Sequence, residues 1–110
     1  MTNIYGQALD INGYAPSIMY IPDDGDSSRC FVCGKGGDLA RHEIFYGTAY
    51  RNRSKELGLW IRVCPACHNE IHNGDKDLDR EVKALAQDHA MDYYGWSVQE
   101  FRYRFGKNWL

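Results

Sequence analysis

The sequence predicts a small α+β domain that is stabilised by a zinc ion and has additional helices at its C-terminal end. Three observations point to this class. The chain of 110 residues suits a single domain, and its 44% hydrophobic and 25% charged residues are an ordinary globular composition. Two Cys-x-x-Cys pairs supply the four ligands of a structural zinc. Strand-like segments lie between these pairs, and apolar residues at helical spacing follow the second pair.

The chain divides into three parts. Residues 1–28 are expected to be an N-terminal extension packed on the domain, residues 29–74 the zinc-knuckle core, and residues 75–110 a C-terminal helical extension. Within the first part, the short apolar run 17–21 predicts an edge strand. The polar stretch 22–26, with its proline and glycine, predicts the loop that closes this strand.

The core is expected to contain two strands and two short helices. Residues 39–46 and 59–63 predict the strands, and the second is the richer in residues of high β propensity. Between them, the polar and basic segment 48–58 predicts a short helix that ends at its final glycine. Pro65 suits the first turn of a second helix, which is expected to continue as far as Gly74.

Two further helices are predicted in the C-terminal part. Asp77 is expected to cap the first, in which four side chains recur at helical spacing. Ser97 and Glu100 have the form of a capping box and open the second, which is expected to end at Gly106. The spaced residues are Val82, Leu85, Ala86 and His89 in the first helix, and Val98, Phe101 and Phe105 in the second.

The four cysteines are predicted to bind one zinc ion. In each pair, two intervening residues let a tight turn present both sulfurs to the same ion, and the glycines of 34–37 allow positive φ there. The second pair leads into a helix, whose N-terminal amides favour the thiolate form. Coordination by four sulfurs leaves no open position, so this zinc is expected to be structural. The ligands are Cys30, Cys33, Cys64 and Cys67.

Three of the four histidines are predicted to form a second metal site. His68 and His72 lie four residues apart in the helix after the second cysteine pair, so both rings project from one helix face. His42 follows the first pair, on a segment that is expected to run back alongside this helix. A pair of solvated histidines without metal is the competing interpretation. His89 is expected to be a packing residue and is left out of the site.

The sequence shows no export signal and no membrane-spanning stretch. It has no run of 18 apolar residues, and residues 1–13 lack the basic start and the apolar stretch of a secretory signal. Four cysteines in such a chain suit metal binding better than disulfides, so we expect a cytoplasmic protein. The net charge of −2 disfavours a general nucleic-acid coat protein, although basic residues cluster locally at 51–55 and 102–107.

Two motifs resemble the HNH endonuclease family. They are Leu-Ala-Arg-His-Glu-Ile at 39–44 and Leu-Trp-Ile-Arg-Val-Cys-Pro-Ala-Cys-His-Asn-Glu-Ile-His at 59–72. The likeness is greatest to small members of phage and prophage type with zinc knuckles, and it extends over residues 29–73 and the Phe-Gly-Lys-Asn-Trp motif at 105–109. It implies the ββα-metal fold, a treble-clef-like hairpin packed on a helix around one divalent ion, and location in a bacterial cell or a phage-infected host.

The resemblance also implies roles for individual residues. His42 matches the hairpin ligand, and His68 and His72 match the helix ligands. Glu43 stands where the family has a histidine general base; shifted by one residue, His42 becomes the base and Arg41, a cation that cannot bind metal, takes the ligand position. A glutamate is a weaker base than imidazole at neutral pH. Glu43 is therefore the base, a further metal ligand, or the mark of a domain that has lost cleavage.

The implied activity is metal-dependent hydrolysis of DNA phosphodiesters, observed as nicking. A divalent ion (Mg²⁺, Mn²⁺, Ni²⁺ or Zn²⁺) would stabilise charge on the phosphate and on the leaving oxygen, and a double-strand break would require two copies of the chain. The family's structural asparagine has its nearest counterparts in Asn52 and Asn69. The basic side chains that can contact DNA phosphates are Arg41, Arg51, Arg53, Lys55 and Arg62.

Two other functions remain open. A nucleic-acid-binding zinc module without catalysis would explain Glu43, but such a module has no need of a histidine pair beside the cysteines. A protein-interaction domain would use the acidic loops and the aromatic residues, of which 93–96 form a patch. Aromatic residues, however, more often fill the core of a domain this small.

Overall fold

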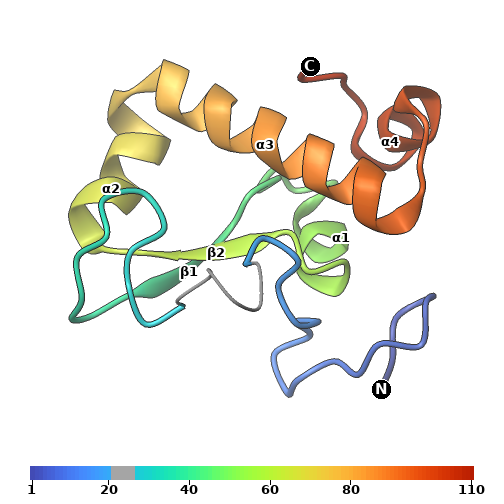
Figure 1. Cartoon of the computed structure of the whole chain (residues 1–110), viewed down its shortest axis with the longest axis horizontal. Coiled ribbons are helices and arrows are strands. Elements are labelled where there is room, and N and C mark those ends of the chain that lie inside the picture. Colours follow the sequence, from blue (N-terminus) through green and yellow to red (C-terminus); the bar gives the residue numbers. More distant parts are fainter. Residues whose placement is uncertain (21–26) are drawn as a thin grey trace.

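The computed structural model describes residues 1–20 and 27–110 (Figure 1). In these ranges two strands form one sheet and helices pack around it, which confirms the predicted α+β class. None of the helices in the described ranges is both long enough and apolar enough to cross a membrane. The elements are β1 (Ala40–Glu43), α1 (Arg51–Glu56), β2 (Trp60–Val63), α2 (Pro65–Asn69), the π-helical turn η1 (Glu70–Gly74), α3 (Lys76–Tyr94) and α4 (Val98–Phe105).

The two strands pair antiparallel, in a register that assigns each side chain to a face of the sheet. His42 lies opposite Ile61, and Glu43 lies opposite Trp60. Directly opposite residues project from the same face of an antiparallel pair, and neighbours in one strand project from opposite faces. His42 and Ile61, both buried, therefore face the core, whereas Glu43 and Trp60 face the N-terminal segment.

Ser54 joins the two ends of the connection between β1 and β2. Its buried hydroxyl accepts a hydrogen bond from the Phe45 amide (3.2 Å) and donates one to the Leu59 carbonyl (2.6 Å). The strand predicted at 39–46 ends early, at Glu43. Beyond it, the Phe45 amide donates its hydrogen bond to the Ser54 hydroxyl and not to a strand partner. The helix expected in this connection forms as α1.

The N-terminal segment packs against the outer face of the sheet without forming a strand there. Ser17 Oγ donates a hydrogen bond to the Trp60 carbonyl at 2.7 Å. A serine side chain that bonds to backbone in this way offers an alternative to strand pairing. The edge strand predicted at 17–21 is accordingly wrong over residues 17–20, of which 18–20 form bends. Residue 21 and the loop predicted at 22–26 lie outside the described residues.

The helix after the second cysteine pair begins at Pro65, as predicted, and continues through η1 to Gly74. The next helix is capped by Asp75 and not by Asp77, which is a correction to the prediction. Asp75 Oδ1 accepts hydrogen bonds from the amides of Asp77 and Leu78, both at 3.0 Å. Because η1 ends at Gly74, α3 starts directly after Asp75. The amides of Asp77 and Leu78 then have no partner within the helix, and they lie within reach of the Asp75 side chain.

Helix α3 extends from the end of η1 toward α4 (Figure 1), and it contributes buried side chains to the hydrophobic core. Val82, Ala86 and Ala90, spaced by four residues, are buried. Leu85 is 39% exposed and His89 is partly exposed, so the buried face of the helix is narrower than predicted. Residues four apart remain on one face of a helix, and the two outliers lie on its flank.

Helix α4 begins and ends where predicted; of the predicted capping box the Ser97 half forms, whereas the Glu100 carboxylate accepts hydrogen bonds from Arg104. The Ser97 hydroxyl accepts a hydrogen bond from the amide three residues on, at 3.1 Å, and Gly106 ends the helix with a φ of +80°. Phe101 and Phe105 are buried against the rest of the core, while Val98 in the first turn is 36% exposed. The C-terminal helices therefore complete the hydrophobic core around the hairpin.

Candidate metal centres

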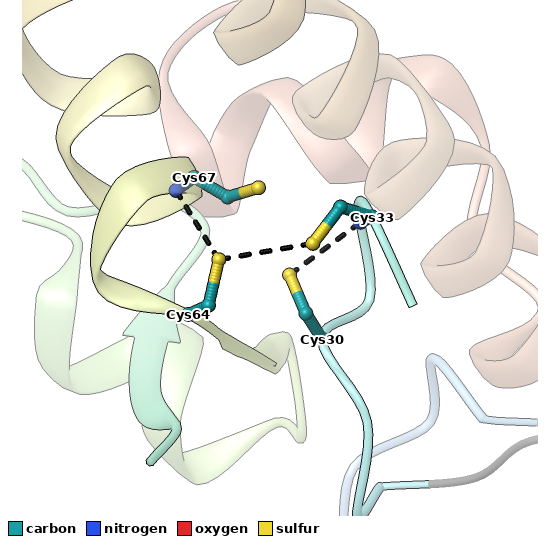
Figure 2. Close-up of side chains that lie close together, drawn as sticks. All are labelled: Cys30, Cys33, Cys64 and Cys67. Carbon is teal, nitrogen blue, oxygen red and sulfur yellow. Dashed lines mark hydrogen bonds between the residues drawn. The ribbon is translucent and has the colours of Figure 1, made fainter. Parts of the chain in front are cut away.

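The four cysteines lie together where the loop before β1 meets the start of α2. Figure 2 shows their side chains turned toward a common centre, two from the loop and two from the helix. The four Sγ atoms lie within 4.8 Å of one another, and the sulfurs of Cys33 and Cys64 are 3.8 Å apart. The set predicted from sequence, Cys30, Cys33, Cys64 and Cys67, is thus brought together and can hold a metal ion such as zinc.

The two cysteine pairs use the same turn. The Cys33 amide donates to Cys30 Sγ, and the Cys67 amide donates to Cys64 Sγ, each at 3.5 Å. After the first pair, Gly34 adopts a φ of +80°, as predicted for a knuckle that needs glycine. In the second pair the turn is also the N-terminus of α2, so the helix itself orients both sulfurs.

Amide donors change the acidity of these thiols. Burial alone would raise the pKa of Cys30, but backbone amides, first among them that of Cys33, lower it to about 6. The amide of Cys67 likewise lowers the pKa of Cys64, whereas burial raises the pKa of the Cys67 thiol. Thiolates are the form that binds zinc, and four of them would leave the ion no open position. This cluster therefore suits a structural ion.

Three histidines converge on the inner side of the hairpin. His42 comes from β1, His68 from α2 and His72 from η1, and ring nitrogens of all three lie within 4.8 Å of one another. The His42 ring centroid lies 5.3 Å from that of His68 and 5.0 Å from that of His72. The Nε2 atoms of His68 and His72 are 3.1 Å apart. The predicted histidine set is thus assembled, and three imidazoles can hold a divalent ion such as zinc.

The burial of His42 is the strongest local indication of a ligand. Only 1% of the residue is exposed, and its buried Nε2 atom has no hydrogen-bond partner among residues 1–20 and 27–110. Burial, followed by the neighbouring His72 and His68, lowers the pKa of His42 to about 3, so the ring is neutral near pH 7. A buried polar atom normally has a partner, and a neutral imidazole nitrogen is a metal ligand. The donor set therefore fits a metal ion.

The π-helical turn η1 positions the third histidine. The Asp75 amide bonds to the Glu70 carbonyl, five residues earlier, at 2.7 Å, which widens the end of the helix that began as α2. His72 lies within this widened turn and His68 lies just before it. π-Helical turns inside helices are rare and are frequent at functional sites. Helical periodicity in the sequence predicts the two histidines on one face but does not distinguish α from π.

A second layer of side chains around the histidines was not predicted from sequence. The Tyr46 ring lies 4.5 Å from that of His72, and its hydroxyl donates to Asp79 Oδ2 at 3.2 Å. The same Asp79 oxygen lies 3.0 Å from Lys83 Nζ. The spacing of Asp79 and Lys83 by four residues predicts an ion pair on a helix. No local pattern in the sequence, however, indicates that Tyr46 contacts this pair.

Glu43 does not belong to the histidine group, although it follows His42 directly. Its carboxylate lies 3.4 Å from Arg51 Nε, and the side chain is 13% exposed. It also interacts with Tyr14, whose pKa burial and this carboxylate raise to about 12. Its charge still acts on His68, where it opposes the lowering of the pKa by burial. The carboxylate therefore lies near the edge of the site, outside the ligand set.

The five basic residues predicted to contact phosphate all have partners within the chain. The Arg41 guanidinium bonds to Asp10 Oδ2 at 2.6 Å and lies 4.3 Å from the Tyr14 ring centroid. Arg62 lies opposite Arg41 in the hairpin and over the Trp60 ring, so both project from the face that His42 does not share. The other pairs are Arg51 with Glu43, Arg53 with the Arg104 carbonyl, and Lys55 over the Tyr14 ring.

The structural asparagine expected from the resemblance has no counterpart in the two candidates. Asn52 is exposed on α1, and Asn69 is exposed on α2, where it bonds to Asn73 one turn away. The side chain that links the two ends of the connection between β1 and β2 is Ser54, which bonds to Phe45 and Leu59. Its signal in the sequence is weak, because a serine inside a polar helix is usually solvated.

Two groups of residues that could hold metal ions thus lie on one small unit, the hairpin and the helix that follows it. The cysteines clamp the loop before β1 to the start of α2, and the histidines bridge β1 to the same helix farther along. Comparison with models of known protein families, with curated proteins and with solved structures found no match to the chain.

Proposed function

We propose that this chain is a metal-dependent endonuclease of the HNH type, which hydrolyses DNA phosphodiesters and nicks one strand of a duplex. One observation supports this above all others. Three imidazoles from a hairpin and the next helix converge beside a four-cysteine cluster, and the most buried of them has a ring nitrogen with no hydrogen-bond partner in the described part of the chain. A group of three ligands, which leaves a coordination position open, suits catalysis better than a purely structural role.

The proposed roles follow from the donor sets. Zinc at the cysteines would hold the hairpin against α2, and so keep His42 in reach of His68 and His72. Three protein ligands leave a coordination position open, which a structural site does not. A divalent ion bound there supplies a Lewis acid for a phosphate oxygen and stabilises the charge of the leaving oxygen.

The general base is proposed to be Glu43. His42 Nε2 is buried among the other histidines and suits a ligand better than a base that must meet water. Although Glu43 projects from the other face of β1, its charge acts on His68, where it opposes the lowering of the pKa by burial. It must accept a proton from the attacking water while it also contacts Arg51.

A nucleic-acid-binding module without catalysis is the second candidate. The contact of Glu43 with Arg51 favours it, because an ion-paired carboxylate on the outer face of the hairpin can be structural. The protein-interaction alternative finds less support. Within its aromatic patch, Trp96 is buried and stacks on Tyr94 at 4.9 Å, so that Tyr93 alone among these aromatics is largely exposed.

A nicking assay tests the proposal. Supercoiled plasmid is incubated with the protein and Mg²⁺, Mn²⁺, Ni²⁺ or Zn²⁺ in turn. The native chain is expected to produce open circles with at least one of these ions, and His68→Ala is expected to lose this activity because one of three ligands is removed. His89→Ala is the matched control, since His89 bonds to the Leu85 carbonyl outside the cluster. Nicking that survives His68→Ala would refute the assignment.

The role of Glu43 is tested in the same assay. Glu43→Gln keeps the shape of the side chain and removes its capacity as a base. Loss of a general base is expected to slow nicking by about 10²–10⁴-fold. An unchanged rate would remove Glu43 from the mechanism, and DNA binding without nicking by the native chain under every ion would favour the second candidate.

A further inference from the structure

An open pocket lies next to the histidine cluster, between the connection after β1, α3 and the C-terminal residues. Its cavity volume is about 330 Å³. Aromatic side chains supply most of its lining, and two lysines add positive charge. The principal lining residues are Tyr46, Tyr50, Lys83, Phe105, Lys107 and Trp109.

The pocket shares one wall with the histidine site. The Tyr46 ring lies 4.5 Å from the His72 ring and 5.5 Å from the His42 ring, and it also lines the pocket. On the pocket side, Lys83 Nζ lies 4.3 Å from the Tyr46 ring centroid. A chain molecule with one unit at the histidines can therefore place its neighbouring unit in the pocket.

The charges in the pocket favour an anion. Asp79 Oδ2 lies 3.0 Å from Lys83 Nζ and largely neutralises that ammonium group. Lys107 is exposed, and its ammonium lies 4.3 Å from the Trp109 ring centroid. Because this ammonium rests on an exposed, flexible stem, it can move off the indole and meet a phosphate while a planar ligand takes its place on the ring.

Gly106 keeps the Tyr50 wall in position. The Tyr50 hydroxyl lies so close to the Gly106 backbone that any Cβ at this position would overlap it. Gly106 also has a φ of +80°, which suits glycine alone. The Tyr50 side chain can therefore lie against the end of α4 because glycine leaves room for it there.

The geometry points to an unpaired nucleotide as the occupant. Bases stack on aromatic side chains without regard to sequence, and a lysine beside such a platform attracts the backbone phosphate. A base inside a duplex has both faces covered by its neighbours, so only an unpaired or extruded base can reach an aromatic wall. We propose that this pocket binds an unpaired base of the strand whose phosphodiester lies at the histidines, with its phosphate against Lys107.

The inference rests on the proposed nuclease function and adds a substrate class to it. A volume of about 330 Å³ is at the small end of ligand sites, which suits one nucleotide rather than a groove for a duplex. The protein is then expected to act next to a bulged, flipped or single-stranded nucleotide in preference to a fully paired site.

Binding to two matched probes tests this. Both are fluorescent DNA duplexes of the same sequence, one fully paired and the other with a single extra unpaired nucleotide. Fluorescence anisotropy of the zinc-loaded protein, without further divalent ion, is expected to show tighter binding of the bulged duplex. Trp109→Ala is expected to weaken binding of the bulged duplex about tenfold and to leave the paired duplex unchanged, because one stacking platform is lost.

Controls separate stacking from folding and from charge. Tyr103→Ala removes an exposed aromatic side chain of α4 that does not line the pocket, and it is expected to leave both affinities unchanged. Lys107→Ala, at an exposed position, is expected to weaken binding of the bulged duplex and to reduce its salt dependence by about one ion. Lys76→Ala removes an exposed lysine from the start of α3 and is expected to have no such effect.

The failures can be told apart. If the native chain binds both duplexes equally, or if Trp109→Ala weakens both equally while its melting temperature is unchanged, the pocket assignment is wrong, and the nicking assay still judges the nuclease. If Trp109→Ala unfolds, the test depends on Lys107→Ala. A lower preference of this variant for the bulged duplex supports the proposal, and an unchanged preference overturns it. If the native chain neither binds nor nicks any DNA, the proposed function fails together with the inference.

Discussion

His42 and Glu43 are neighbours in the chain, yet they project from opposite faces of the hairpin and have different surroundings. His42 is buried with two other imidazoles, and Glu43 contacts Arg51 and Tyr14 on the outer face. At the residue scale, the face of the strand therefore decides the chemistry. His42, which faces the core, and Glu43, which does not, therefore cannot exchange the proposed roles of metal ligand and general base.

The low pKa of His42 predicts how stability depends on pH. Its pKa is about 3 in the folded protein, whereas an unfolded histidine titrates at 6.5. Between these values the unfolded chain binds a proton that the folded chain does not, so stability rises with pH from 3 to 6.5 and is fully present above 6.5. His42→Gln removes this contribution.

Urea denaturation at pH 7.5 and at pH 5.5 measures this effect, in protein with zinc at the cysteines and no metal at the histidines. The free energy of unfolding of the native chain is expected to fall by about 1 kcal/mol more than that of His42→Gln over this interval. Protonation of the thiols affects both proteins alike, so the difference isolates His42. Parallel losses would show that the ring is not held neutral by burial.

At the element scale, short elements form the site because other segments restrain them. The hairpin has four residues in each strand, and a two-stranded ribbon of this size is not stable alone. Ser54 closes its connection, α3 packs over its inner face, and the N-terminal segment covers its outer face. The turn at Gly58 lies between two of these restraints, the Ser54 bond to Leu59 and the N-terminal segment at Pro16.

Gly58 is predicted to be sensitive to substitution for two separable reasons. Its φ is +72°, and a Cβ at this position would overlap the Pro16 carbonyl. Gly95 has the same φ of +72° but open space around it, so Gly95→Ala measures the cost of backbone conformation alone, about 1–2 kcal/mol. Gly58→Ala is expected to lower the melting temperature further, because the N-terminal segment must also move. Equal melting temperatures would show that this segment is not packed against the turn.

At the scale of the whole molecule, one hydrophobic core includes residues from the N-terminal segment to α4. Met19, Ile44, Ile71, Ala90 and Phe101 all belong to it. The cysteine cluster lies at one edge of this core and joins two segments that are 30 residues apart in sequence. Loss of its ion is therefore expected to loosen the histidine site as well as the knuckles.

Removal of one cysteine tests this coupling. Cys33→Ser, at an exposed position, is expected to lower the zinc content from about one ion per chain to none and to reduce stability by on the order of several kcal/mol, since zinc binding contributes directly to folding. His68→Ala is expected to keep its zinc. Elemental analysis and thermal unfolding give both readouts. A Cys33→Ser protein with unchanged zinc would contradict the four-cysteine assignment.

The sequence by itself determined the two Cys-x-x-Cys turns and the pairing of His68 with His72, because these are local patterns with local geometry. It also determined the second strand, the Ser97 cap and the end of α4 at Gly106, which depend on residues next to each other in the chain. Tertiary structure alone decided that residues 17–20 do not extend into a strand, that Asp75 caps α3, and that Ser54 closes the hairpin connection.

The same division holds for the site. Arg41 and Arg62 cluster in sequence with the predicted site, but the pairing register turns them to the other face of the sheet. Tyr46, Lys83 and Trp109 share no motif, and only tertiary packing places Tyr46 beside His72 and brings Lys83 over the rings of Tyr46 and Trp109. Side-chain identity and short spacing are written in the chain, whereas contacts between distant segments arise from burial of the whole core, which no local pattern encodes.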